Sequence, residues 1–473
     1  MSRGTRCLAL LLSSCAAVAA AGAATFDVLD FGAAGDNETD DGAAIAAAYR
    51  ACREAGGGTV LFRGGGGGGG GERIYRTGPV SLACNDSVML LEPGATLAAR
   101  NSSAGWPLGP DSPEPAQGRT ARQMAPLLHV DHGRNVSVVG GGALDAEGEV
   151  WWREACGNWW CPPGFNHTSP RAFRPFLLRA DGTRGLAVRN VTMRNPGFWN
   201  LVPVHSHGIV IEDVNVSARW SSSEAAAAAD RGGAGQHADP YGSTPNTDGF
   251  EPMWSSDVLV RRCRVLNGDD CITIKSGSRD VLVEDLYCEH GDGLTIGSVW
   301  YDDVTNVTYR RVTMNRTHNG PMIKGRSQGN ATVSGITFED ITLIDVYLAL
   351  TVDCDYETPG AVVPNSGVRV WDVTFRNITG TVCLPRPRGA AAADGAADGA
   401  ANGAVGGDPS FLVDAAGTFF CRPEHPCSLA LVDVSVRHSS NANVTPPAWK
   451  CNSSDIAATR VSPGLPGACV PAL

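Results

Sequence analysis

Short runs of β-branched and other apolar residues alternate with polar turns along most of the chain, from about Leu127 onward. Each run holds two apolar stretches separated by a polar turn, as in residues 185–193, 208–216, 257–265, 280–287, 331–338 and 367–375. Gly185 and Gly208 open two such runs 23 positions apart, and Asp257 and Asp280 open another two at the same spacing. A repeated coil of this length predicts an all-β, stacked parallel solenoid. An antiparallel sandwich would also show many short strands, but the regular coil length favours the solenoid.

The region before the first repeats has a different pattern. Residues 26–33 and 56–62 have the composition of strands, and the apolar positions between them, from residue 42 to Cys52, follow the period of an amphipathic helix. We therefore expect one short helix that caps the N-terminal end of the solenoid.

The first 23 residues resemble a secretory leader. Arg3 and Arg6 precede an apolar stretch from Leu8 to Ala20, and Ala21-Gly-Ala23 follows as a cleavage signal. A membrane anchor is the alternative, but the apolar stretch is short and no basic cluster follows it. This pattern predicts a signal peptide at residues 1–23, no membrane span, and a single β-helix domain at residues 24–473.

Three stretches interrupt the repeats, at residues 64–71, 221–237 and 389–407. They are rich in Gly and Ala and hold few side chains that could be buried. We expect them to be flexible loops inserted between coils.

Cysteine usage supports an extracellular protein. The chain has 15 cysteines, and 13 remain after the leader, so at least one lies outside an intramolecular disulfide. The close pairs Cys156/Cys161 and Cys421/Cys427 suit local disulfides, because no finger-like set of His and Cys accompanies them. Several Asn-x-Ser/Thr triplets also fit secretion.

The formal net charge of −11 argues against a nucleic-acid partner. It also gives no general attraction for acidic polymers, so local cations must hold any acidic substrate.

Acidic residues recur at the spacing of one coil. Asp248, Asp270 and Asp292 are each separated by 22 positions, and Lys324 lies on a following coil. Positions one coil apart in a parallel solenoid lie about 4.8 Å apart on the same face, so these carboxylates should form a ladder. Singly, Asn-Thr-Asp-Gly and Gly-Asp-Asp are also good turn sequences. A ladder of like charges, however, favours a catalytic site over turns alone.

Eight short motifs, in this order along the chain, resemble the polygalacturonases and related pectin-backbone hydrolases of glycoside hydrolase family 28. They are Asp30-Phe-Gly-Ala33, Gly142-Ala-Leu-Asp-Ala-Glu-Gly-Glu-Val-Trp-Trp152, Arg174-Pro175, Asn195-Pro-Gly-Phe-Trp199, Asn246-Thr-Asp248, Gly268-Asp-Asp270, Gly293-Leu-Thr-Ile-Gly-Ser298 and Asp355-Tyr356. The resemblance runs from Phe26 to roughly Cys383. It implies a right-handed, single-stranded parallel β-helix, a monomer secreted to the extracellular space or cell wall, and a pectin-like substrate containing uronic acid.

The resemblance also implies roles for individual residues. Asp269 matches the general acid of an inverting hydrolase, and Asp248 and Asp270 match the residues that position and deprotonate the attacking water. That scheme calls for a gap of about 6.5–9.5 Å between acid and base.

Further residues are expected around these acids. Lys324 and Tyr356 would bind the substrate, with Asn246 and Asp292 beside them, and a disulfide between Cys271 and Cys288 would fix the floor of the site. No cofactor and no metal are expected.

Two positions depart from the family pattern. Asp292 stands where the family usually has His, and Met322 stands where it usually has Arg, so two positive or proton-carrying groups are lost. The enzyme could act on a less acidic sugar, His290 could partly compensate, or the protein could bind glycan without cutting it.

Two other readings come from different classes of protein. A pectate lyase on the same fold would use calcium and a basic residue. A non-catalytic binder could stack sugars on exposed tryptophans, for which Trp151, Trp152, Trp159 and Trp160 are the candidates, although these could instead pack a disulfide-linked cap.

Overall fold

The computed structural model describes residues 24–65, 71–111, 113, 123–154, 174–221, 244–326, 328–356, 367–383, 415–439, 448–452, 454–466 and 469. The chain divides into two units. The first comprises Met1–Ala155, Ser169–Ser217 and Ser255–Cys263, and the second comprises Cys156–Thr168, Ala218–Trp254 and Arg264–Leu473. The leader at 1–23 and nearly all of the expected loops at 221–237 and 389–407 lie outside the described residues, as does part of 64–71.

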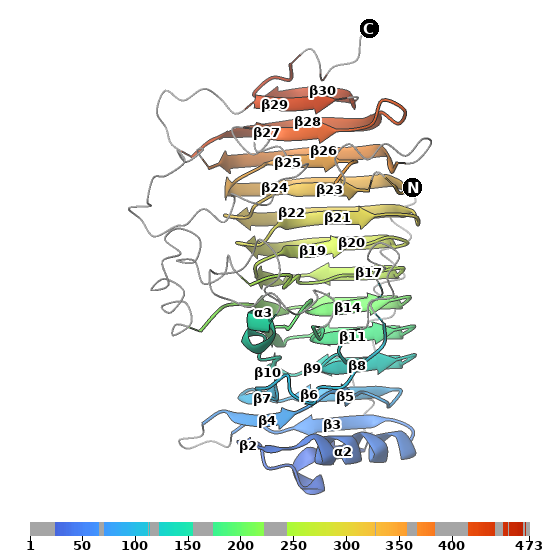
Figure 1. Cartoon of the computed structure of the whole chain (residues 1–473), viewed down its shortest axis with the longest axis vertical. Coiled ribbons are helices and arrows are strands. Elements are labelled where there is room, and N and C mark those ends of the chain that lie inside the picture. Colours follow the sequence, from blue (N-terminus) through green and yellow to red (C-terminus); the bar gives the residue numbers. More distant parts are fainter. Residues whose placement is uncertain are drawn as a thin grey trace. The chain divides into compact units, whose positions relative to one another are not determined.

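The first unit begins with the expected capping helix. Strand β1 (Thr25–Asp27), the 3-10 turn η1 (Val28–Phe31) and β2 (Asp36–Asp40) precede α2 (Gly42–Glu54), and β3 (Gly58–Phe62) follows it. Helix α2 buries one apolar face, made of Ala44, Ile45, Ala48, Tyr49 and Cys52, and contacts η1, β1 and β3 (Figure 1). Its last buried residue, Cys52, forms a disulfide with Cys84 that ties the helix to the coils.

Three rows of parallel strands build the rest of the first unit. One row is β1–β3–β6–β9–β12–β15–β17, a second is β2–β4–β7–β10–β13–β16, and a third is β5–β8–β11–β14. Their bounds are β4 (Arg73–Thr77), β5 (Val80–Ser81), β6 (Ser87–Leu91), β7 (Ala95–Ala99), β8 (Leu128–Asp131), β9 (Arg134–Val139), β10 (Ala143–Asp145), β11 (Leu178–Asp181), β12 (Arg184–Arg189), β13 (Thr192–Arg194), β14 (Leu201–Val204), β15 (His207–Glu212), β16 (Asn215–Ser217) and β17 (Ser256–Arg261), with a short helix α3 (Glu149–Glu154) after β10. Arg184 pairs with His207, which confirms the 23-residue coil read from Gly185 and Gly208.

The second unit contains two rows of parallel strands. One is β18–β20–β22–β24–β26–β28–β30 and the other is β19–β21–β23–β25–β27–β29. The bounds are β18 (Arg264–Leu266), β19 (Asp270–Ile274), β20 (Arg279–Glu289), β21 (Gly293–Val299), β22 (Val304–Asn315), β23 (Pro321–Gly325), β24 (Thr332–Val346), β25 (Leu350–Asp353), β26 (Arg369–Val382), β27 (Ala415–Phe420), β28 (Cys427–His438), β29 (Ala448–Asn452) and β30 (Ser454–Ser462). Each unit is thus a parallel β-solenoid.

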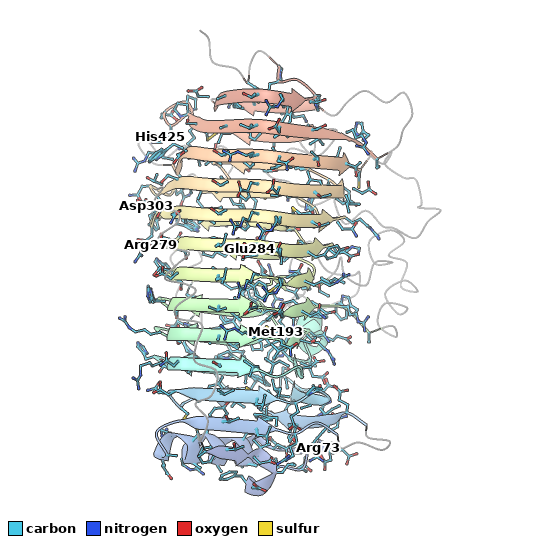
Figure 2. The ribbon with its side chains drawn as sticks, turned by 180° about the vertical axis from the view of Figure 1, so that it is seen from behind. Arg73, Met193, Arg279, Glu284, Asp303 and His425 are labelled. Carbon is cyan, nitrogen blue, oxygen red and sulfur yellow. A yellow bond between two sulfur atoms is a disulfide. The ribbon has the colours of Figure 1, made fainter. Side chains whose placement is uncertain are left out.

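Equivalent side chains stack on one another inside the second unit. Tyr309, Phe338 and Phe375 are paired in register on β22, β24 and β26, and their ring centroids are 4.9 and 5.2 Å apart. Ionic pairs bridge neighbouring coils at the same time, because Glu284, labelled in Figure 2, accepts hydrogen bonds from Arg310 and Arg311 one coil later. Stacked aromatic rings and ion pairs between coils thus hold successive coils in register.

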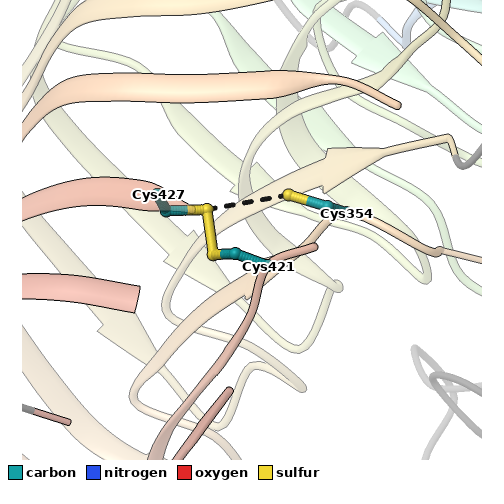
Figure 3. Close-up of side chains that lie close together, drawn as sticks. All are labelled: Cys354, Cys421 and Cys427. Carbon is teal, nitrogen blue, oxygen red and sulfur yellow. Dashed lines mark hydrogen bonds between the residues drawn. A yellow bond between two sulfur atoms is a disulfide. The ribbon is translucent and has the colours of Figure 1, made fainter. Parts of the chain in front are cut away.

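Disulfides form where the sequence predicted them in the second unit. Cys271 pairs with Cys288 and Cys421 with Cys427, and a further bond joins Cys451 to Cys469. The Cys156/Cys161 pair lies outside the described residues. Cys354 remains a buried thiol, and its Sγ lies 3.8 Å from Sγ of Cys427 (Figure 3).

The idea that Trp151 and Trp152 offer a sugar-stacking surface is wrong. Their side chains are only 3% and 0% exposed. Trp152 donates its indole N–H to the carbonyl of Pro196, and Trp151 packs edge-on against Trp106. They are core residues of the first unit. Trp159 and Trp160 lie outside the described residues.

Among the residues described, no helix has both the length and the apolar character to cross a bilayer.

Candidate active site

Backbone register brings Asp248 next to Asp270. The amide of Gly249 donates to the carbonyl of Asp270 at 2.9 Å, and Phe250 forms a parallel bridge with Ile272. The bridge is offset by the 22 positions read from the sequence, and the hydrogen bond joins the residue after Asp248 to Asp270, as a parallel pair in this register requires. The predicted first rung of the acid ladder is therefore confirmed.

The next rung is shifted by one residue. Asp270 pairs with Gly293, and the amide of Asp292 donates to the carbonyl of Asp269 at 2.7 Å. The shift arises at an irregularity between Asp270 and Ile272, where one strand carries an extra residue. Asp292 consequently lies beside Asp269, and the prediction of a straight ladder through Asp270 is wrong at this position.

Turn residues hold the acids in place. Asn246 adopts the left-handed conformation (φ 53°) that Asn tolerates better than most residues. Asn267 donates its side-chain amide to the carbonyls of Thr247 and Asp270. At Gly291 a Cβ would lie 2.1 Å from the carbonyl oxygen of Asp269, so only glycine fits there. Good turn sequences and a catalytic arrangement therefore coincide here.

Three carboxylates converge in this part of the second unit. Asp248, Asp269 and Asp270 are 3%, 8% and 3% exposed. Each can direct one oxygen so that all three lie within 4.8 Å of one another. These oxygens are nearer to one another than the 6.5–9.5 Å expected between acid and base.

Asp270 is held by donors on every side. The ammonium of Lys324 lies 3.2 and 2.9 Å from its two oxygens, Thr295 donates at 2.5 Å, and Thr273 donates at 2.9 Å. A carboxylate offers about four lone-pair sites, so these donors nearly saturate it. Burial alone would lower the pKa of Lys324, but the Asp270 charge raises it well above its usual value. The two residues form a buried ion pair.

Asp269 receives weaker support. Its oxygens accept one hydrogen bond from the Asn246 amide at 3.1 Å and one from the backbone N–H of Asp270 at 2.8 Å. Burial, followed by the charges of Asp292 and Asp270, raises the pKa of Asp269 well above its usual value. This carboxyl is therefore the one suited to carry a proton in the site.

Asp248 is crowded in a similar way. Burial, followed by the charges of Asp269 and Glu251, raises the pKa of Asp248 well above its usual value, and a hydrogen bond with Glu251 adds to the effect. Glu251 is itself fully buried and lies 3.4 Å from the ammonium of Lys275. Asp248 thus has a high proton affinity, which is what a general base requires.

Asp292 pairs with a histidine from the following turn. Nδ1 of His318 lies 3.5 Å from Oδ1 of Asp292, and both side chains are about a fifth exposed, at 17% and 20%. Burial alone would raise the pKa of Asp292, but the hydrogen bond and charge of His318 lower it overall. The structure places His290 elsewhere, with Nε2 3.8 Å from Glu289.

Aromatic rings and cations lie beside the acids. The ammonium of Lys324 is 5.1 Å from the centre of the Tyr356 ring. The guanidinium of Arg326 lies 5.3 Å from the same ring and 5.2 Å from that of Trp300. Met322 is only 1% exposed and replaces the usual Arg with a buried apolar side chain. The structure therefore brings all the predicted site residues into one region of the second unit.

Sequence reasoning missed Glu251, Thr273, Thr295 and His318. Thr273 and Thr295 occupy paired positions of β19 and β21, so a comparison of successive coils could have found them. His318 follows Asp292 by 26 positions, which departs from the 22-residue spacing because the coils lengthen here. Nothing in the local sequence marks Glu251.

The family model for glycosyl hydrolases family 28 matches residues 116–387, more than half of the chain. Among curated proteins, the chain is similar to a probable endopolygalacturonase B of Aspergillus flavus, with 31% identity over 54% of the chain and 64% of that protein. It is also similar to a polygalacturonase of Juniperus ashei, with 26% identity over 57% of the chain and 48% of that protein. The aligned parts thus span about half to two thirds of these relatives.

Solved structures share the fold. An exopolygalacturonase of Thermotoga maritima superposes with a TM-score of 0.69 at 17% identity, covering 96% of both chains. An endo-xylogalacturonan hydrolase of Aspergillus tubingensis superposes with a TM-score of 0.63 at 19% identity, covering 95% of this chain and 98% of the other. These matches confirm the predicted right-handed parallel β-helix.

Proposed function

The chain belongs to glycosyl hydrolases family 28, and from this premise we propose that it is a secreted hydrolase that cleaves glycosidic bonds in pectin-type polysaccharides. The observation that carries the proposal is the cluster of three buried carboxylates, Asp248, Asp269 and Asp270, with oxygens within 4.8 Å of one another. A glycosidase needs one protonated and one ionised carboxyl group near the scissile bond. This cluster holds carboxyl groups in such contrasting environments.

Asp269 acts as the general acid. Its raised pKa keeps a proton available, and its neighbours Asp270 and Asp292 supply the negative charge that retains this proton. Transfer of the proton to the glycosidic oxygen lets the leaving sugar depart as an alcohol. Asn246, which donates to Asp269, fixes the orientation of the carboxyl group.

Asp248 accepts the proton of the attacking water, and Asp270 orients that water and stabilises the positive charge that develops on the sugar. This division follows from hydrogen bonding, because Lys324 and two threonines already occupy most of the acceptor capacity of Asp270. Oxygens of Asp248 and Asp270 lie within 4.8 Å of each other, close enough for one water to hydrogen-bond to both at about 2.8 Å. From the resemblance to the inverting hydrolases of the family, we propose direct attack by water with inversion at the anomeric carbon.

The substrate contacts come from Lys324 and Tyr356. An ammonium has three N–H groups, so its contact with Asp270 leaves Lys324 donor capacity for a substrate oxygen. The half-buried ring of Tyr356 lies against this ammonium and can contact the sugar. Because Met322 offers no second cation, we propose that the site accepts uronic acid with less charge pairing than an arginine would supply.

Secretion, a monomeric state and cell-wall location are part of the proposal. Secretion is supported by the leader-like N-terminus and by the disulfides of the second unit.

A glycan-binding protein without turnover is the second candidate. It is favoured by Asp292 and Met322, because each replaces a cation of the family pattern with a group that does not attract a uronate. The survival of all three core acids favours the hydrolase.

One assay separates the two candidates. Reducing-sugar release is measured on polygalacturonic acid, rhamnogalacturonan and neutral polysaccharides without added calcium, for wild type and Asp269→Asn. We expect release by wild type and a loss on the order of 10²–10⁴ in the variant. Asp455→Asn, a change at an exposed aspartate of β30, serves as the matched control and should keep full activity.

Binding measurements on the same polymers complete the assay. A folded wild-type protein that binds a polymer but releases nothing would replace the hydrolase with the binding protein. For an active enzyme, proton NMR of the first product decides the stereochemistry: the opposite anomer supports inversion, and the retained anomer would overturn it.

A further inference from the structure

The pair formed by Asp292 and His318 lies one coil beyond the general acid. The amide of Asp292 donates to the carbonyl of Asp269 at 2.7 Å, and the amide of His318 donates to the carbonyl of Gly291 at 2.9 Å. The backbone therefore stacks three successive turns on one another. The imidazole of His318 also packs edge-on against Tyr347, with centroids 5.8 Å apart. These contacts fix the ring where its Nδ1 meets the Asp292 carboxylate.

The negative charge of Asp292 disfavours ionisation of Asp269. Two carboxylates on adjacent coils of a buried cluster repel each other by several kcal/mol if both are ionised. Asp292 is the neighbour whose charge contributes most to the raised pKa of Asp269. Anything that keeps Asp292 ionised therefore keeps Asp269 protonated.

We propose that His318 is a positioning residue that holds Asp292 in its ionised form and thereby keeps the proton on Asp269. This inference rests on the proposed function, in which that proton is delivered to the leaving sugar. His318 acts through Asp292 and touches no reacting atom. In the usual family pattern a histidine stands at position 292 itself, so here the imidazole reaches the site from one coil later.

Other charged groups face this pair. They are Asp269 on the preceding turn and Lys324 on β23. Lys324 also favours the ionised form of Asp292. Its ammonium, however, lies 2.9 Å from an oxygen of Asp270, whereas the partner of the Asp292 carboxylate is Nδ1 of His318 at 3.5 Å.

The test detects the protonation of Asp269 through its effect on thermal stability, so it does not depend on catalytic turnover. The thermal unfolding midpoint is measured against pH for wild type and Asp269→Asn, and the difference between them reports the pH at which Asp269 loses its proton in the folded state. The same pair is measured in a His318→Gln background. We expect the difference to appear about one pH unit lower there, because Asp292 takes up a proton once its partner is gone.

Further variants separate positioning from a merely structural role. Asp292→Asn should shift the titration in the same direction, and adding His318→Gln to it should cause no further shift. His318→Lys places a cation at this position and should restore the wild-type titration. His132→Gln, a change at an exposed histidine of the first unit, should leave it unchanged.

The pH profile of kcat/KM provides a second measurement in the active enzyme. Its alkaline limb should move to lower pH in His318→Gln, by the same amount as the stability difference. An unchanged or upward shift in both measurements would overturn the inference. Loss of hydrolysis in wild type with the stability shift intact would instead overturn the proposed function and leave the pair established.

Discussion

Two sides of the acid cluster differ in the groups that surround their buried carboxylates. On the paired side, Asp270 receives an ammonium and two hydroxyl donors, from Lys324, Thr273 and Thr295. On the crowded side, Asp248 and Asp269 face other acids, and the pKa values of both are raised by burial and then by neighbouring negative charges. Asp269 and Asp270 are adjacent in sequence, so the difference comes from the coils that stack on each of them.

This contrast explains how one site holds both forms of a carboxyl group. Donors on the paired side stabilise the ionised form of Asp270, and repulsion on the crowded side disfavours ionisation of Asp248 and Asp269 together, so that one of them keeps a proton while the other is ionised. A hydrolase needs both within reach of one glycosidic bond. The contrast can be tested by removing each side separately.

Removal of the cation from the paired side should have the largest effect on stability. Lys324→Met leaves the Asp270 charge buried without its ammonium, and we expect a loss of about 3–5 kcal/mol in the free energy of unfolding. Urea denaturation measures it. The double variant Lys324→Met with Asp270→Asn should recover much of the loss, and a double variant as unstable as the single one would contradict the ion pair.

Removal of one hydroxyl donor should have a smaller effect. Thr295→Val and Thr273→Val each delete a hydrogen bond to a charged group, which is worth about 1.5–3 kcal/mol. Thr351→Val is the matched control, because its hydroxyl donates to the neutral side-chain oxygen of Asn319. Its expected cost is about 1 kcal/mol. Equal losses in all three variants would show that Asp270 carries no special charge.

The crowded side should respond in the opposite direction. A carboxyl whose folded pKa exceeds its unfolded value of about 3.9 keeps its proton when the unfolded chain has lost it, so stability falls as pH rises through that window. Asp269→Asn removes this penalty. We expect the variant to be more stable than wild type at pH 7, by about 1.4 kcal/mol for each unit of pKa shift, and to lose this advantage below about pH 4. A variant less stable than wild type at pH 7 would argue against a crowded Asp269.

Chelation should have the smallest effect. The ammonium of Lys324 lies on Asp270 and opposes entry of a second cation among the three acids. Hydrolysis of polygalacturonic acid should therefore be the same with and without EDTA. Activity that disappears with EDTA and returns with calcium would favour the lyase reading.

The solenoid and the first acid pair could be predicted from the sequence, because both depend on a spacing of residues that repeats along the chain. Gly185 and Gly208 revealed the coil length, and the spacing of Asp248 and Asp270 revealed their contact. The shifted rung at Asp292 could not be read, because it depends on an irregularity of a single residue beside Asp270.

Other features depend on packing that no local pattern records. His318 reaches Asp292 across a coil whose length departs from the repeat. Trp151 and Trp152 could be read from the sequence either as sugar-stacking or as packed side chains, and the structure buries both. Large aromatic side chains serve both as core and as binding surface, and their sequence alone does not separate the two.

The most direct test of the acid role of Asp269 compares two substrates that differ only in how much the leaving group needs a proton. Asp269→Asn and wild type are assayed on polygalacturonic acid and on an aryl uronide with a strongly acidic phenol as leaving group. We predict that the variant loses on the order of 10²–10⁴ in kcat/KM on the polymer and little on the aryl uronide, since a stable phenolate departs without protonation. An equal loss on both substrates would contradict general acid catalysis by Asp269.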